Sequence, residues 1–242
     1  MPRTGTASSI TERAYQRLRG DLLACRLHPG DRLNMQNLCL EFDVSLGAVR
    51  EALSRLTSEG LVIAEPQRGF RVTPISEADL IDLTNARNDI EGLCLRRSIT
   101  VGDVTWETNV VAAEYRLGRT TYRAADDPNR LSEEWSDAHR LFHESLVAGC
   151  DNRALLRVRS QLYDQSERYR RLSVPLAHTT RDLDREHREL MNMALQRQAD
   201  RVCELMVAHL SETTKILLEA LEESSEIRSS PTAERAQLAL PQ

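Results

Sequence analysis

Four of the six histidines follow a pattern that could bind a metal ion. His139 and His143 are four residues apart, so on one helix their side chains share a face about 5–6 Å apart. His187 and His209 lie in two later segments that are predicted to be core-facing helices. Neutral imidazoles from three helices suit Zn²⁺ or another borderline transition metal. The alternative is a set of buried histidines, each hydrogen-bonded to a backbone carbonyl or to water.

Six helices are predicted to position these residues in a domain that spans 76–222. Apolar spacing and break signals such as Gly102 and Pro175 define them. A helix begins near Ser76, and the others cover about 104–123, 129–149, 152–172, 178–197 and 199–222. The polar segment 223–242, with Pro231 and Pro241, is predicted to be a disordered tail.

The N-terminal segment 8–74 has a different organisation. A helix capped by Ser9 is followed by helices at about 34–42 and 46–59, with a tight connection between these two. Two β-rich runs, 61–64 and 69–73, flank a turn at 65–68. Helix, turn, helix and hairpin is the order of a winged helix-turn-helix. The fold class is therefore mainly α, with a winged N-terminal domain and an all-α C-terminal bundle.

Arginines lie where this N-terminal fold would meet DNA. The third helix packs an apolar stripe inside and leaves its N-terminal end free for a groove. Arg50 is one turn into that helix, and Arg55 lies further along it. Arg68 and Arg71 flank the wing turn, where Gly69 allows close approach of the backbone. The alternative is a small helical bundle with surface arginines.

The distribution of charged residues differs between the two segments and supports different functions for them. Residues 1–75 carry ten arginines against eight acidic residues, whereas the remainder carries 22 basic and 29 acidic residues. This asymmetry indicates a nucleic-acid end and an acidic, non-nucleic-acid end. Five widely spaced cysteines without a CxxC pair indicate a reducing, cytoplasmic compartment. No secretory signal and no apolar run of about 20 residues is present, so no membrane partner is expected.

The N-terminal motif resembles the GntR family of bacterial transcription regulators. It reads Val44-Ser45-x-x-x-Val49-Arg50-Glu51-Ala52-Leu53-x-x-Leu56-x-x-Glu59-Gly60-Leu61-Val62, then Arg68-Gly69-Phe70-x-Val72. The resemblance implies that Arg50, Gly69 and the start of the recognition helix (Ser45, Leu46 and Gly47) serve double-stranded operator DNA. The family usually has arginine where this chain has Leu46, and a different operator is therefore expected.

The C-terminal segment resembles the FCD effector domain of FadR-type GntR regulators. Phe142-His143, Glu186-His187 and His209-Leu210 match its characteristic positions. The resemblance implies that these histidines bind a metal together with an aspartate, and His139 stands in the aspartate's place. An all-histidine set suits Zn or Ni.

The same resemblance implies a small-molecule site. Arg87 matches an arginine that faces the cavity of this domain and binds a carboxylate, for which a guanidinium offers a bidentate fork. The alternative is an ion pair between Arg87 and Glu91, four residues later. Tyr163, Arg168 and Tyr169 lie on a helix that could line the same cavity.

Further shared features resemble the CsiR-type subgroup, which includes glutarate-responsive repressors. They are Gly102-Asp103-x-x-Trp106-Glu107, His139-x-x-Phe142-His143, Val147-Ala148-Gly149-Cys150 and Arg168-Tyr169-Arg170. The resemblance implies a repressor released by a C5 dicarboxylate. A homodimer reading two half-sites of an inverted repeat is expected, because protein symmetry mirrors operator symmetry.

Two other functions are compatible with parts of the pattern. Histidines around a metal could activate water in a hydrolase, but there is no HExxH motif, and Glu144 and Glu186 are the only candidate bases. An architectural DNA-binding protein with a structural metal would bind DNA regardless of small acids. The expectation is a regulator and not an enzyme.

Overall fold

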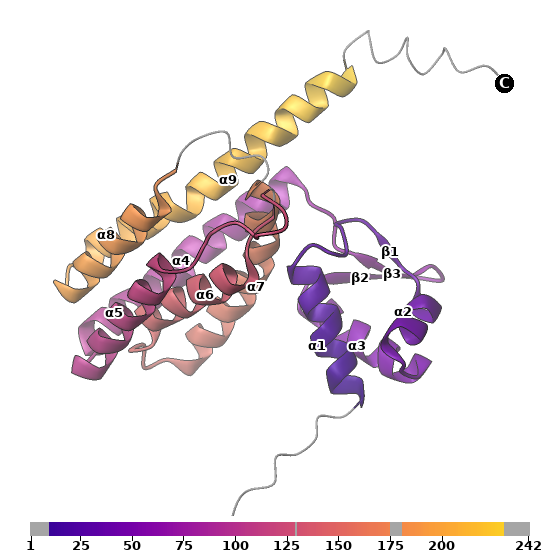
Figure 1. Ribbon diagram of the computed structural model, residues 1–242, viewed down its shortest axis with the longest axis horizontal. Coiled ribbons are helices and arrows are strands. Elements are labelled where there is room, and N and C mark those ends of the chain that lie inside the picture. Colours follow the sequence, from indigo (N-terminus) through magenta and orange to yellow (C-terminus); the bar gives the residue numbers. More distant parts are fainter. Residues whose placement is uncertain (1–9, 129, 175–180, 230–242) are drawn as a thin grey trace, which may run out of the picture. The chain divides into compact units, whose positions relative to one another are not determined.

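The computed structural model of the chain describes residues 10–128, 130–174 and 181–229. It divides into two compact units, and the boundary between their main parts lies between Ser76 and Glu77. Among the described residues, the first part contains three helices and three short strands, and the second contains six helices (Figure 1). The predicted mainly α architecture is confirmed.

The N-terminal unit is a winged helix-turn-helix. Its elements are α1 (Ile10–Leu23), β1 (Arg32–Leu33), α2 (Met35–Phe42), α3 (Leu46–Ser58), β2 (Val62–Glu65) and β3 (Gly69–Val72). The strands form an antiparallel sheet in the order β1-β3-β2, with Leu33 opposite Phe70 and Val62 opposite Val72. The sequence predicts only the β2–β3 hairpin, because a two-residue strand is too short to show an alternating pattern.

The connection between α2 and α3 is a tight turn with defined caps. Asp43 ends α2 in the left-handed region, with φ of 51°. Ser45 begins α3 by accepting a hydrogen bond from the N–H of Ala48 at 3.3 Å. Apolar side chains from the helices and the sheet close one core beneath this turn: Leu18, Leu22, Leu38, Val49, Leu53, Leu56, Leu61 and Val72.

The C-terminal unit is a bundle of helices. They are α4 (Glu77–Val101), α5 (Val104–Gly118), α6 (Glu133–Val147), α7 (Arg153–Ser173), α8 (Leu183–Leu195) and α9 (Ala199–Ser229). Polar side chains cap the N-termini of four of them: Asp103, Ser132, Asn152 and Asp182. The core between the helices includes Leu95, Ile99, Trp106, Val110, Phe142, Leu146, Leu190, Val202 and Met206.

Several helix boundaries differ from the prediction. Helix α5 ends at Gly118 and α6 begins at Glu133, and the segment between them contains an antiparallel bridge between Arg123 and Leu131. Helix α9 continues to Ser229, so 223–229 is helical rather than part of a disordered tail. This stretch contains neither proline nor glycine to stop the helix. Ser9, residues 178–180 and residues 230–242 lie outside the described residues.

Gly102 joins α4 to α5 where a side chain has no room. A Cβ atom at this position would lie 2.5 Å from the indole of Trp106 and 2.8 Å from the carbonyl oxygen of Ser98. We expect Gly102→Ala to lower the free energy of unfolding by about 1–3 kcal/mol, the usual cost of overpacking.

Gly118→Ala is the matched control for this variant. No atom lies within 4 Å of a Cβ there, and helix propensity predicts a gain of at most about 1 kcal/mol from alanine. Urea unfolding followed by circular dichroism compares the two variants with the wild-type protein. Equal midpoints for Gly102→Ala and the wild-type protein would contradict the prediction.

Candidate functional site

The exposed end of α3 carries the residues predicted to read DNA. Ser45, Leu46, Gly47 and Arg50 are exposed, whereas Val49 is fully buried in the core. Side chains and backbone N–H groups at such an end can reach base edges and phosphates in a major groove. The structure therefore leaves these four residues available for DNA.

The turn between β2 and β3 presents a second candidate surface. The N–H of Arg68 donates to the carbonyl oxygen of Glu65 at 3.0 Å, and Gly69 has a φ of 87°, which favours glycine. Arg71 donates from Nε to Oε1 of Glu65 at 2.9 Å, while the side chain of Arg68 is exposed. Arg68 is therefore the guanidinium that the tip of the wing presents to solvent.

Arg55 has partners that the sequence pattern does not reveal. Its Nη1 donates to Oε2 of Glu12 at 2.7 Å, and its guanidinium lies 3.7 Å from the centroid of the Tyr15 ring. Both partners are on α1. These contacts tie Arg55 to α1, while its side chain stays 43% exposed, so its contact with DNA stays a prediction.

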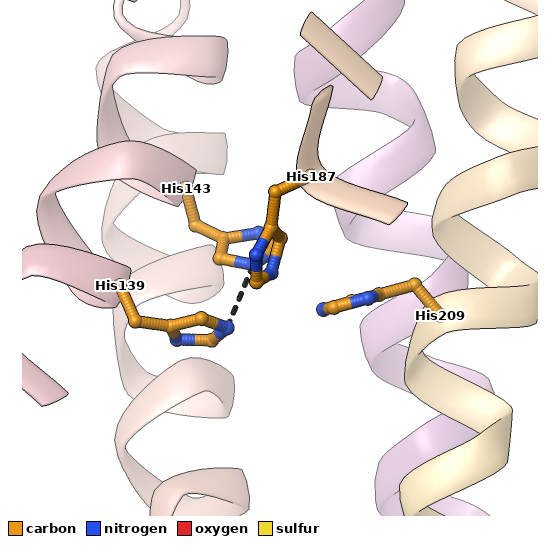
Figure 2. A group of neighbouring side chains, drawn as sticks. All are labelled: His139, His143, His187 and His209. Atoms are coloured by element: carbon orange, nitrogen blue, oxygen red, sulfur yellow. Dashed lines mark hydrogen bonds between the residues drawn. The ribbon is translucent and has the colours of Figure 1, made fainter. Parts of the chain in front are cut away.

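Four histidines converge in the interior of the helical unit, and these are the four that their spacing predicts. His139 and His143 come from α6, His187 from α8 and His209 from α9 (Figure 2). All four are buried, and one candidate ligand atom from each lies within 4.8 Å of the others. The Nε2 atoms of His139 and His143 are 3.1 Å apart (Figure 2, dashed line).

Burial keeps these imidazoles neutral. It lowers the pKa of all four rings, and the neighbouring histidines lower the pKa of His139, His143 and His187 further. A neutral imidazole retains the lone pair that a metal ion requires. The direction of these shifts therefore favours metal binding by the cluster.

His187 shows most directly that a metal would fit. Its side chain is 1% exposed, and neither ring nitrogen has a hydrogen-bond partner among the described residues. Leaving a buried polar atom without a partner costs about 1–3 kcal/mol. The alternative interpretation requires a carbonyl or a water for each ring, and no such carbonyl is found for His187 in the described chain. A divalent transition metal would satisfy its acceptor nitrogen.

A carboxylate beside the cluster orients His209. Its Nδ1 lies 2.7 Å from Oε2 of Glu186, and Arg181 donates to the two carboxylate oxygens of Glu186 at 2.8 and 2.7 Å. Burial alone would raise the pKa of Glu186, but the hydrogen bonds from His209 and Arg181 lower it to about 2. When Nδ1 donates to a carboxylate, Nε2 is the nitrogen left for a metal.

A cavity of about 540 Å³ opens onto the histidine cluster. His139 and His209 form part of its wall. Its other lining residues include the apolar or aromatic Tyr122, Trp135, Leu183 and Ile216, the arginines Arg123, Arg170 and Arg181, and the aspartates Asp182 and Asp184. Apolar walls with a few cationic groups suit a small organic anion.

The three residues predicted to bind an effector do not line this cavity. Tyr163 and Tyr169 are buried on α7. Arg87 is buried on α4, and its positive charge adds to burial and to the neighbouring histidines in lowering the pKa of His143. Arg87 therefore lies close to the cluster, although α4 contributes no residue to the cavity wall.

The predicted alternative to effector binding by Arg87 is an ion pair with Glu91. A second arginine, Arg159, pairs with this carboxylate. Arg159 on α7 donates to Glu91 from Nη2 at 2.9 Å and from Nε at 3.0 Å. Arg159 and Arg181 are thus functional or structural candidates that the sequence pattern does not single out, and Arg170 is one that it includes in a shared motif without a role. Every predicted helix of the C-terminal domain contains arginine, so burial and partners are needed to distinguish these residues.

Comparisons with known proteins identify the two units. Residues 10–72 match the bacterial regulatory proteins of the gntR family, and residues 82–212 match the FCD domain. The chain belongs to the GntR family of transcription regulators. It carries the FCD effector domain, and the family is one of regulators rather than enzymes.

Two curated relatives cover most of this GntR regulator. The HTH-type transcriptional regulator BphR of Paraburkholderia xenovorans is 40% identical over 86% of this chain and 85% of its own. The HTH-type transcriptional repressor GlaR of Escherichia coli is 33% identical over 86% of this chain and 95% of its own. BphR is therefore more similar to the chain than GlaR, which represents the CsiR-type subgroup.

Solved structures share the fold at lower identity. McbR/YncC of E. coli superposes with a TM-score of 0.70 at 18% identity, covering 89% of this chain and all (100%) of its own. A GntR regulator from Rhodococcus sp. RHA1 gives a TM-score of 0.68 at 20% identity, covering 87% and 98%. No helix in the described part of the chain is long and apolar enough to cross a membrane.

Proposed function

We propose that the protein is a cytoplasmic, homodimeric repressor whose affinity for operator DNA is controlled by a small carboxylate. The carboxylate binds beside a divalent transition metal, Zn²⁺ or Ni²⁺, in the FCD domain. The observation that carries this proposal is the cluster of four buried histidines beside a cavity whose wall includes three arginines. The name of GlaR as a repressor supports the direction of regulation.

Seven exposed or partly exposed residues of the winged domain form the proposed DNA contact. They are Ser45, Leu46, Gly47 and Arg50 at the start of α3, Arg55 further along it, and Arg68 and Gly69 at the wing. Two copies of this surface in a homodimer would read two half-sites related by the same two-fold symmetry.

The histidine cluster is the proposed metal centre. His139, His143, His187 and His209 would hold the ion, which when bound supplies a Lewis acid for one carboxylate of the effector. Arg87 supplies positive charge close to His143, and Tyr163 and Tyr169 remain candidates for the effector site. An effector changes DNA affinity only by its differential affinity for two states, typically about 1–3 kcal/mol.

Glutarate is the first effector to test. The resemblance to CsiR-type regulators, with GlaR at 33% identity, supports a C5 dicarboxylate. The test is fluorescence anisotropy with the DNA upstream of the protein's own gene, with and without glutarate, at fixed salt because phosphate contacts depend steeply on ionic strength. Weaker DNA binding with glutarate supports the proposal. Tight binding that no small acid changes would instead favour an architectural protein.

Arg50→Ala is expected to weaken operator binding at each half-site by about 1–3 kcal/mol. Its side chain is exposed at the start of α3, so the fold should be unaffected. The same anisotropy assay measures the loss. Arg26→Ala is the control, because this exposed arginine pairs with Asp21 (Nε–Oδ1 2.7 Å) and lies outside the proposed contact. Wild-type affinity in Arg50→Ala would remove this residue from the DNA contact.

A further inference from the structure

Arg170 lines the cavity and makes a cation–π contact with an aromatic ring. Its guanidinium carbon lies 5.0 Å from the centroid of the Trp135 ring, and its Nη2 is 3.5 Å from Oγ of Ser136. Trp135 stacks on His139, with ring centroids 4.6 Å apart and an angle of 21° between the planes. The indole therefore contacts both a lining arginine and a candidate metal ligand.

The positive charge of Arg170 lowers the pKa of two histidines of the cluster. The pKa of His139 is lowered first by burial, then by His143 and then by the charge of Arg170. The pKa of His187 is also lowered by Arg170, after the larger lowering effects of burial, His209 and Arg181. Arg170 is thus close to the cluster by ring contacts and by electrostatics.

The other two arginines of the cavity have different surroundings. Arg181 makes a paired contact with the carboxylate of Glu186 and also donates to the carbonyl oxygen of His209 at 2.7 Å. Arg123 is exposed and donates to the carbonyl oxygen of Pro128. Arg181 helps to orient His209 through Glu186, and the side chain of Arg123 is exposed to solvent. Arg170 is the lining arginine held against the Trp135–His139 stack.

We propose that Arg170 binds a second carboxylate of the effector while the first binds at the histidine cluster. This inference rests on the proposed effector site. It adds that the site prefers a dicarboxylate to a monocarboxylate of the same chain length. A guanidinium pairs with a carboxylate through two parallel hydrogen bonds, and a cation–π contact with the indole helps to hold the Arg170 side chain at the cavity. Leu183 and Ile216 supply apolar wall for the methylene chain.

The experiment compares glutarate with valerate, which has five carbons and one carboxylate. Isothermal titration of each acid into the Ni²⁺-loaded, full-length wild-type protein should show tighter binding of glutarate. In Arg170→Met, glutarate affinity is expected to fall about 10- to 100-fold, as for a lost hydrogen bond between charged groups. Valerate affinity should stay within about threefold of the wild-type value. Arg170→Lys should restore part of the glutarate affinity, because lysine keeps the charge without the fork.

Arg171→Met is the matched control. Arg171 is the next residue on α7, donates to Glu133 at 2.9 and 2.7 Å, and does not line the cavity. It should leave both affinities unchanged, and Ni²⁺ and operator binding should be unchanged in every variant. If Arg170→Met keeps the preference for glutarate, or loses both acids equally, the role of Arg170 is overturned while the effector site stands. If the wild-type protein binds neither acid, the proposed effector class falls as well.

Discussion

His143→Ala is expected to lower the affinity for Ni²⁺ or Zn²⁺ by well over a hundredfold. His143 is fully buried, and its Nε2 lies 3.1 Å from that of His139, so removal of its ring opens the middle of the cluster. Loss of a residue that only touches a ligand typically costs 10- to 100-fold in metal affinity, and loss of a ligand itself should exceed this. Titration of the metal-free protein in competition with a chelator measures the change.

Two further variants make this result specific. His28→Ala removes an exposed histidine of the winged domain and should leave metal affinity unchanged. Glu186→Gln keeps all four rings but weakens the contact that orients His209, so an intermediate loss of about 10- to 100-fold is expected. Equal metal affinity in His143→Ala and His28→Ala would show that the cluster does not hold the ion.

The elements and the histidine set could be predicted from the sequence because both depend on local periodicity. Spacing of three and four residues places His139 and His143 on one helix face, and apolar neighbours turn that face inward. The N-terminal motif likewise joins local signals: a cap at Ser45, an apolar stripe on α3 and a glycine at the wing. These features are encoded within one or two helical turns of each residue.

The partners of the charged residues could not be predicted in the same way. Arg55 pairs with Glu12 on another helix, and Arg159 pairs with Glu91, which is 68 residues away in the sequence. Such choices depend on which helices pack together, not on spacing within one helix. The cavity wall could not be predicted for the same reason, because the α6, α7 and α9 residues around it become neighbours only after the bundle forms.

The charged interior has a consequence for how the bundle is stabilised. Glu91, one turn of α4 after Arg87, is fully buried, and its partner Arg159 on α7 is 3% exposed. Removing one partner of a buried ion pair leaves the other charge buried and uncompensated, which is far more costly than losing an exposed pair. The Glu91–Arg159 pair therefore ties α4 to α7 next to the histidine cluster.

Glu91→Gln is accordingly expected to destabilise the protein by about 3–5 kcal/mol, because the Arg159 guanidinium loses its counter-charge in the core. Glu189→Gln is the control. Its pair with Arg201 is half exposed, at 3.4 Å, and should contribute less than about 1 kcal/mol. The double variant Glu91→Leu with Arg159→Met removes both charges of this pair and should be more stable than Glu91→Gln. Urea unfolding of the metal-free proteins distinguishes these cases, and equal stability of Glu91→Gln and Glu189→Gln would show that the buried charge is compensated by another group.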